Sequence, residues 1–438
     1  MRAAGAHLQR RFRRSCSVAA ATHSIYFLGA HPHSVSTDAI MEPLSQGSGL
    51  ESLAHTQRCC DRLVKLLGTL QWPACSQFQA FGETYQLPIR SIRGCSSFAE
   101  KDGSKVQACS SQQLEYAAGF FDGDGCVSVK GGLSGCVLSI TQSANHGEAA
   151  VLFYRLFGGG IYIQSSGIGP RQPKIQWMLQ GSSVRHVAAK LAPFSCVKQA
   201  QLFIAAKWPT SFAHRSAEAL EIKKLKREPC SEMPSCTWAY VAGFFDAEGC
   251  ISISQRGAVI TLAFTQHVNN KAVLVGIQRF LRIRLPQNPS SITTDRECHV
   301  LHVSSTAMSR AVLNIFLSSG LLVKQASARA ALSLEHVNHA SVRNQMEALT
   351  GNQSRYKRLD SDGCQRAVVI SRLNCRLYRL RSKEDVAAGA AAKRLHSELT
   401  ELRQLHVLEN AKARLSKLRH DIRILLRHGA RPCQIQLS

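Results

Sequence analysis

The sequence lacks any apolar run of the ~18 residues that a helix needs to cross a bilayer, so we exclude a membrane-spanning protein. It also lacks a Cys-x-x-Cys pair, although it contains 16 cysteines. Because structural zinc sites usually use such pairs, we expect no zinc site. Scattered cysteines in a chain this long are typical of small, buried, reduced side chains in a reducing compartment.

Acidic residues are scarce. The 438 residues include 54 Lys+Arg against 29 Asp+Glu, a formal net charge of +25. Such an excess favours a polyanionic partner, since each cation set against a phosphate releases condensed counterions. The alternative at this point is a soluble basic protein without a nucleic-acid partner. The length is sufficient for two or three domains with buried cores.

The N-terminus has no acid before Asp38 but five arginines among its first fourteen residues. This composition is typical of an organelle transit peptide, which we assign to residues 1–37. The polar residues 22–24 interrupt the apolar core that a secretory signal would need. We therefore expect a mitochondrial or chloroplast location. A disordered basic tail is the alternative, and the nucleus or cytoplasm would then be the location.

One segment of the chain occurs twice. The thirteen residues from Tyr116 to Ser128, YAAGFFDGDGCVS, return from Tyr240 to Ser252 as YVAGFFDAEGCIS. Nine of the thirteen positions are identical, at a constant offset of 124 residues, and the other four are conservative changes. Chance does not produce this agreement, so the chain contains an internal duplication.

The duplication extends beyond this segment. SITQ at 139–142 returns as AFTQ at 263–266, and VKQA at 197–200 returns unchanged at 323–326. We assign a first repeat to 111–228 and a second to 236–345, joined by a proline-containing linker at 229–235. Residues 38–110 form an N-terminal extension of unknown role, and 346–438 form a basic, helical C-terminal extension.

Each repeat begins with a predicted helix and continues into strands. Ser110 and Gln113 have the spacing of a capping box before the first helix. After the helix, apolar Val127 and Val129 alternate with polar residues, as in a half-buried strand, and a second strand ends at Gln142. A less clear stretch and a helix follow. The second repeat shows the same pattern, so each repeat is predicted to be an α+β unit with one polar strand face.

The motifs AAGFFDGDG at 117–125 and VAGFFDAEG at 241–249 resemble the paired LAGLIDADG motifs of single-chain homing endonucleases. The resemblance covers about 235 of the 438 residues. It implies a pseudo-symmetric duplication of an αββαββα-type unit, with the motif helices packed at the centre and the sheets forming a DNA-binding saddle. It also implies a monomer that cuts double-stranded DNA at one long, specific site.

Each motif places a carboxylate at the end of its helix. Small residues at Gly119 and Gly243 allow the two helices to cross closely, which would bring Asp124 and Glu248 together. Neighbouring carboxylates repel unless a divalent cation lies between them. Oxygen ligands favour Mg²⁺, completed by water and phosphate oxygens, and the metal can activate water for phosphodiester cleavage. We expect two or three divalent ions shared by this pair, the role that the resemblance also implies.

Lys198 and Lys324 occupy the same position in both repeats, at the head of a helical stretch. An ammonium group there can stabilise pentavalent phosphate charge or hold the attacking water, whereas an isolated lysine in a basic protein is usually a solvated surface charge. The resemblance favours the first role. It also implies that Gln142 and Gln266 position water at the edge of the site. Without the resemblance, each is an ordinary strand-end amide.

The other motif acids, Asp122 and Asp246, are expected to make helix-end hydrogen bonds rather than to bind metal, because aspartate favours such bonds. The predicted catalytic residues are therefore Asp124, Glu248, Lys198, Lys324, Gln142 and Gln266. Polar strand faces can lie in the major groove of DNA. The candidates for DNA contact are therefore Ser128, Lys130, Ser252, Ser254 and Arg256. A solvated strand face is the alternative for each of these five residues.

The C-terminal extension carries an apolar repeat with spacings of four and three residues, formed by Ala411, Leu415, Leu418, Ile422 and Leu425. It predicts an amphipathic helix with a short heptad repeat and a C-cap at Gly429. His406 breaks the register of a similar leucine pattern upstream. The helix is expected to pack against the endonuclease body, and extra DNA or RNA contact is the alternative.

Two other functions fit the same repeats. In the family the fold also serves RNA-binding intron maturases, and the basic C-terminal extension keeps intron RNA open as a partner. A cleavage-inactive DNA-binding protein is the second alternative. Neither function needs the acids and lysines that are present in both repeats here, so we favour the nuclease.

Overall fold

The computed structural model describes residues 49–90, 109–230, 236–254, 257–287, 290–295, 297–349, 356, 358–382 and 386–433. Within these ranges the chain forms two units: 75–165 with 173–349, and 49–74 with 166–172 and 356–433. The predicted targeting segment at 1–37 lies outside the described residues, and its role stays a prediction.

The first repeat is an αββαββα unit followed by two further helices. Its elements are α2 (Ser111–Asp124), β4 (Gly125–Val129), β5 (Cys136–Ser143), α3 (Glu148–Phe157), β6 (Gly160–Ser165), β7 (Lys174–Leu179), α4 (Ser183–Leu191), α5 (Gln199–Ala206) and α6 (Phe212–Leu225), with short 3-10 turns at Gly131–Leu133 and Ala192–Phe194. The strands form an antiparallel sheet in the order β4-β5-β7-β6.

The second repeat has the same order of elements. These are α7 (Trp238–Glu248), β8 (Gly249–Ile253), β9 (Ile260–His267), a 3-10 turn at Val268–Asn270, α8 (Lys271–Arg284), β10 (Ser290–Asp295), β11 (Cys298–Val303), α9 (Thr306–Ser318), α10 (Gln325–Leu332) and α11 (His339–Leu349). Its sheet order, β8-β9-β11-β10, matches that of the first repeat. The expected α+β duplication is confirmed, and a helix and two strands occupy the stretch that the sequence left undefined.

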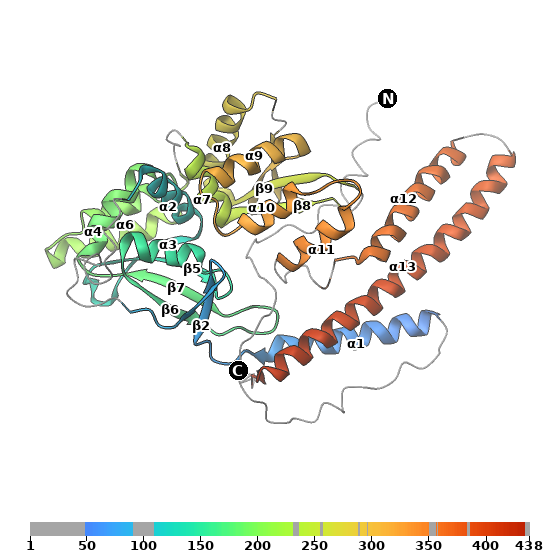
Figure 1. The fold of residues 1–438 in the computed structure, drawn as a ribbon, viewed down its shortest axis with the longest axis horizontal. Helices are drawn as coiled ribbons and strands as arrows, with labels where there is room; N and C mark the ends of the chain where they lie inside the picture. The colour runs from blue at the N-terminus through green and yellow to red at the C-terminus, as the bar shows by residue number, and fades with distance from the viewer. Residues whose placement is uncertain are drawn as a thin grey trace. The chain divides into compact units, whose positions relative to one another are not determined.

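The two motif helices α2 and α7 lie side by side at the centre of this unit (Figure 1). A methyl group added at Gly119 would overlap the carbonyl oxygen of Tyr240, and one at Gly243 would overlap the carbonyl oxygen of Tyr116. The helix backbones are therefore in direct contact, and only glycine fits at the two crossing positions. The expected central packing is confirmed.

Caps fix where the motif helices begin and end. Ser110 and Gln113 form both hydrogen bonds of the predicted capping box before α2, and the Thr237 side chain caps α7. At the other end the backbone turns extended at Gly125 (φ −80°, ψ 160°) and Gly249 (φ −85°, ψ 158°), where the next strand begins. The last residue of each helix is consequently the predicted metal ligand.

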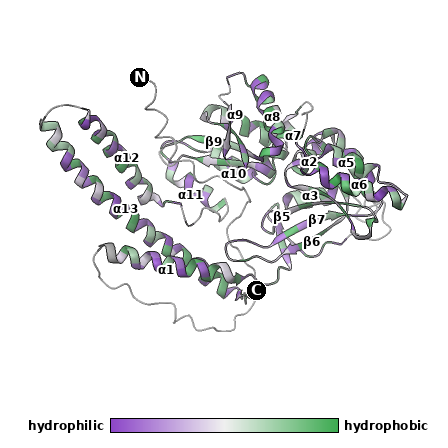
Figure 2. Ribbon diagram, turned by 180° about the vertical axis from the view of Figure 1, so that it is seen from behind, coloured by the Kyte–Doolittle hydropathy of each residue, from purple (hydrophilic) through white to green (hydrophobic). Residues whose placement is uncertain are grey.

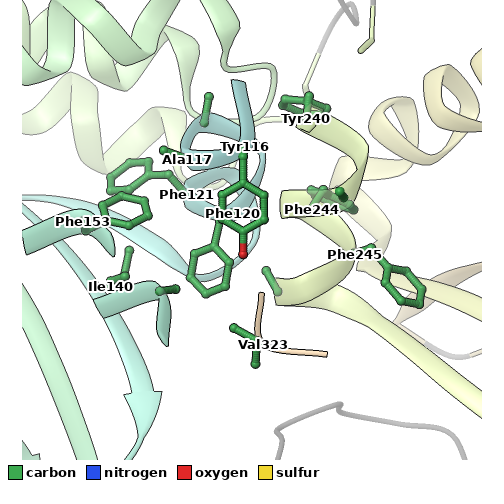
Figure 3. Packing of buried hydrophobic residues seen from close by; sticks show 14 of the residues in the cluster. Tyr116, Ala117, Phe120, Phe121, Ile140, Phe153, Tyr240, Phe244, Phe245 and Val323 are labelled. Carbon is green, nitrogen blue, oxygen red and sulfur yellow. The ribbon is translucent and has the colours of Figure 1, made fainter. Parts of the chain in front are cut away.

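Each sheet has one apolar face covered by helices. In the first repeat Phe153 of α3 packs edge-on against Trp177 of β7, with ring centroids 5.1 Å apart. Phe121 of the motif helix stacks on the same Phe153 ring (Figure 3). Val127 of β4 is fully buried, whereas the adjacent Ser128 is partly exposed on the opposite face. This alternation leaves a polar face on each sheet that the core helices do not cover.

The second unit consists of α1 (Gly49–Thr69), β1 (Leu70–Gln71), α12 (Ser361–Arg381), α13 (Val386–Arg427) and β12 (Arg431–Pro432). Hydrophilic and hydrophobic residues alternate along α12 and α13 (Figure 2). On α13, residues 415–425 supply the predicted heptad positions, which pack against Leu63 and Leu67 of α1. The expectation that this helix packs on the endonuclease body is therefore corrected: its apolar face is covered by α1.

The first part of α13 packs against α12 and its later part packs against α1. Leu395 and Leu399 contact α12 through Leu377, whereas the later leucines contact α1. The register break at His406 lies between these two parts, where the helix that packs against α13 changes from α12 to α1. Gly429 has a φ of +83°, and Ala430 N–H donates to the carbonyl of Leu425 at 2.9 Å. The predicted C-cap is confirmed as a Schellman motif.

The N-terminal extension contributes to both units. Its first part forms α1 and β1 of the second unit, while β2 (Gln77–Ala80) and β3 (Glu83–Gln86) form a hairpin in the first unit. The cysteines of the described ranges form no disulfide with one another. None of the described helices combines the length and apolar character that crossing a bilayer requires.

We predict that Gly243→Ala lowers the free energy of unfolding by about 1–3 kcal/mol or more, because the new methyl group would force α2 and α7 apart. Gly131→Ala is the matched control, since a Cβ there meets nothing within 4 Å. Urea denaturation of both variants measures the difference. Equal midpoints would show that the helices tolerate a wider spacing.

Candidate active site

Asp124 and Glu248 end the two crossing helices, and the structure brings them together as predicted. A methyl group at the neighbouring Gly123 would lie 3.0 Å from the Glu248 side chain. Desolvation by the surrounding protein, together with the Glu248 charge, raises the pKa of Asp124 to about 7. Desolvation also raises the pKa of Glu248. Asp124 nevertheless has exposed surface, so a cation from solvent can reach it.

The residues present fit a divalent cation. Two carboxylates in a partly desolvated site are costly to ionise together, and a bound cation offsets that cost. In the described part of the chain, no cluster of three or more His, Cys, Asp and Glu side chains could hold a metal. A cation between Asp124 and Glu248 would therefore complete its shell with water and phosphate oxygens, as Mg²⁺ commonly does.

Asp122 and Asp246 organise the segments that carry the two lysines. Asp122 accepts hydrogen bonds from the backbone N–H groups of 196–198 at 2.5 to 3.1 Å and from the Ser195 hydroxyl at 2.5 Å. Asp246 likewise accepts from the N–H groups of 322–324 at 2.6 to 3.0 Å. The acids therefore make hydrogen bonds as expected, but to the segments that lead into α5 and α10 rather than to the ends of their own helices.

Lys198 and Lys324 stand at the N-caps of α5 and α10, as the sequence predicted. Lys198 Nζ donates to the carbonyl oxygens of 121–123 at 2.5 to 3.1 Å, which are the last turn of α2. Lys324 Nζ donates to the carbonyl oxygen of Asp246 in α7. Each ammonium group therefore lies at the negative end of a motif helix dipole, where a cation is favoured.

The lysines also interact electrostatically with the acids. Burial lowers the pKa of Lys198, while Asp122, Glu248 and Asp124 raise it. In return Lys324 and Lys198 lower the pKa of Asp124. Both lysines are partly buried, so the alternative of solvated surface lysines does not describe them.

The two predicted glutamines differ in their contacts. Gln266 Nε2 donates to Glu248 Oε1 at 3.2 Å, which places this amide at the site. Gln142 Oε1 instead accepts from the backbone N–H groups of Ala149 and Ala150 at 3.1 and 3.2 Å, at the start of α3. Gln142 thus has the structural role of a helix cap, and its predicted catalytic role stays a prediction.

Three site residues were not singled out from the sequence. The hydroxyl groups of Tyr116 and Tyr240 reach the motif acids of the opposite repeat. Lys174 lowers the pKa of Asp124 through its charge. The tyrosines are identical in both motifs, which was an available signal. Lys174 could not be identified from the duplication, because the equivalent position of the second repeat, in β11, is Cys298.

The predicted DNA-contact residues lie on or next to the polar sheet faces. Ser128 is partly exposed on β4 and Ser252 is exposed on β8. Lys130 and Ser254 each follow the last residue of their strand, and Lys130 is exposed. Arg256 lies outside the described residues. Ser252 Oγ donates to the carbonyl oxygen of Thr261 at 3.3 Å, within its own sheet.

No protein-family model matches the sequence, and no curated protein matches it. Solved structures with a similar fold are LAGLIDADG homing endonucleases. I-SmaMI bound to uncleaved DNA target with calcium ions is 15% identical (TM-score 0.39), with 54% of this chain and 97% of that chain covered. LAGLIDADG meganuclease I-AabMI bound to uncleaved DNA is 17% identical (TM-score 0.41), with 54% and 99% covered. The chemistry of the site follows from this chain's own residues.

The raised pKa of Asp124 predicts a pH-dependent stability. Its pKa is about 7 in the folded chain and ~3.9 when unfolded, so the folded state loses stability as pH rises through that interval. Asp124→Asn should remove part of this loss, and Mg²⁺ should stabilise the unsubstituted chain but not the variant. Thermal unfolding between about pH 4 and pH 8, with and without Mg²⁺, measures both effects. Parallel curves for the two proteins would contradict the assignment.

Proposed function

We propose that this chain is a metal-dependent endonuclease that hydrolyses phosphodiester bonds of double-stranded DNA at a long, specific site. The observation that carries the proposal is the meeting of Asp124 and Glu248 at the ends of two crossing helices, with Lys198 and Lys324 beside them. Paired carboxylates flanked by ammonium groups suit a substrate with a phosphate anion and a hydrolytic water.

Asp124 and Glu248 would hold Mg²⁺, which when bound supplies an activated water and stabilises the leaving oxygen. Gln266 orients Glu248 through its amide hydrogen bond. Lys198 and Lys324 keep positive charge next to the acids, where a phosphate gains negative charge during hydrolysis. The motif helices carry the two acids and accept hydrogen bonds from the two lysines, so little reorganisation is needed when substrate binds.

The polar sheet faces are the proposed DNA-binding saddle. The net charge of +25 supplies attraction to phosphates, and side chains such as Ser128 and Ser252 lie on strands that a major groove can accept. A monomer with two similar repeats would contact the two halves of one target. Intron RNA is the partner under the maturase alternative, and residues 1–37 would direct the chain to a mitochondrion or chloroplast.

The acids provide the first test. Asp124→Asn and Glu248→Gln should each reduce cleavage by at least about a hundredfold while duplex binding in Ca²⁺ survives, since the strand-face contacts are intact. The substrate is a duplex selected by the full chain from a randomised library. Glu221→Gln is the control, because this partly exposed acid on α6 pairs with Lys224 and lies in neither motif. Full cleavage by either acid variant excludes this site, and binding without any cleavage by the unsubstituted chain favours a non-nuclease.

The lysines provide an independent test. Lys198→Met or Lys324→Met should slow single-turnover cleavage on the order of a hundredfold with little change in affinity, because a charge at the reacting phosphate is lost. Lys130→Met is the matched control: an exposed phosphate contact should weaken binding and reduce the log–log salt slope by about one. Unchanged cleavage in both lysine variants would remove them from the mechanism.

A further inference from the structure

The hydroxyl groups of Tyr116 and Tyr240 make reciprocal contacts across the centre of the first unit. Tyr116 Oη donates to Asp246 Oδ2 at 2.7 Å, and Tyr240 Oη donates to Asp122 Oδ2 at 2.8 Å. Each of these four side chains is at most 3% exposed. Figure 3 shows the two tyrosines on the facing motif helices. A buried hydrogen bond to a carboxylate is stronger than one between neutral groups, so the pairs hold a defined geometry.

The backbone also fixes the position of each tyrosine. The carbonyl oxygen of Tyr116 lies against Gly243, and that of Tyr240 lies against Gly119. The same residue therefore forms the closest helix contact and reaches the acid of the opposite motif. Its ring has little freedom to move without separating α2 from α7.

The acids carry this contact on to the lysines. Asp246 binds Tyr116 and also the N–H groups of 322–324, and Lys324 is the last residue of that segment. Asp122 does the same for Tyr240 and Lys198. The path in each half thus runs from the tyrosine of one repeat, through an acid, to the lysine of the other repeat.

We propose that Tyr116 and Tyr240 are positioning residues that act across the repeats, Tyr116 orienting Lys324 and Tyr240 orienting Lys198. Neither lysine site is complete within its own repeat. This inference deepens the proposed nuclease function, since it states how the two halves of the site are held in a common geometry.

The two halves differ in the number of hydrogen bonds that the acid accepts. Asp122 has a fifth donor in the Ser195 hydroxyl, at 2.5 Å, whereas the matching residue in the second repeat is Leu321. Loss of the tyrosine hydroxyl leaves Asp122 with four donors and Asp246 with three. Tyr116→Phe should consequently disturb Lys324 more than Tyr240→Phe disturbs Lys198.

The test measures the reactivity of each lysine in the full chain, without metal or DNA, by amine acylation and mass spectrometry. Tyr116→Phe should raise the labelling rate of Lys324 roughly fivefold and leave Lys198 unchanged, while Tyr240→Phe should give the opposite pattern with a smaller rise. Adding Ser195→Ala to Tyr240→Phe should make the two rises equal. Tyr85→Phe, which removes a hydroxyl bonded at 2.9 Å to Glu83 in the hairpin, should change neither lysine.

A general loosening of the fold would raise both labelling rates in both variants, and that result would overturn the proposal. So would a rise at the lysine of the same repeat. Because this readout needs no cleavage, it decides the proposal even if the chain proves not to be a nuclease. If the chain does cut the selected duplex, Tyr116→Phe and Tyr240→Phe should slow opposite strands, matching the strand preferences of Lys324→Met and Lys198→Met respectively. Equal slowing of both strands by each variant would also contradict it.

Discussion

The close approach of α2 and α7 at Gly119 and Gly243 is the constraint on which the first unit depends. With no side chain at these positions, backbone carbonyls of one helix lie against the other helix. This distance decides whether the carboxylates at the helix ends interact and whether the tyrosine hydroxyls reach the opposite acids. Hydrophobic burial of the surrounding phenylalanines supplies the driving force, but the glycines set the geometry.

The two acids of each motif differ in burial and in hydrogen bonding, and therefore in the roles that they can have. Asp122 and Asp246 are buried and accept hydrogen bonds from several donors, so a ligand arriving from solvent does not reach them. Asp124 has exposed surface and few such donors, and its pKa rises to about 7. Two residues of sequence separation are enough to give the two acids of a motif different surroundings, because the second acid is the last residue of its helix.

Much of this architecture could be predicted from the sequence because identical residues at a fixed offset must form equivalent structures. The offset identified both motif helices, the first two strands of each sheet and the acid pair, whereas the other two strands of each sheet were left undefined. The divergence of Gln142 and Gln266 was not predictable: the Gln142 amide caps the start of α3, whereas a 3-10 turn at Val268–Asn270 precedes α8 and the Gln266 amide donates to Glu248 instead. The packing of α1 against α13 was not predictable either. An apolar stripe on a helix indicates that another element covers it, but it does not identify that element. The tyrosine contacts span about 120 to 130 positions of sequence and resemble ordinary core aromatics.

The reciprocity of the tyrosine contacts has an evolutionary consequence. The tyrosine of each repeat binds the acid of the other repeat, and the two contacts involve equivalent residues. An isologous homodimer has the same kind of interface. A shorter ancestral chain with one repeat could therefore have paired with its own copy through the same contacts. Fusion of two copies releases each half to mutate alone, and Glu248 for Asp124 or Leu321 for Ser195 record such drift. For the proposed endonuclease, this independence would permit a target without palindromic symmetry while the centre of the unit stays symmetric.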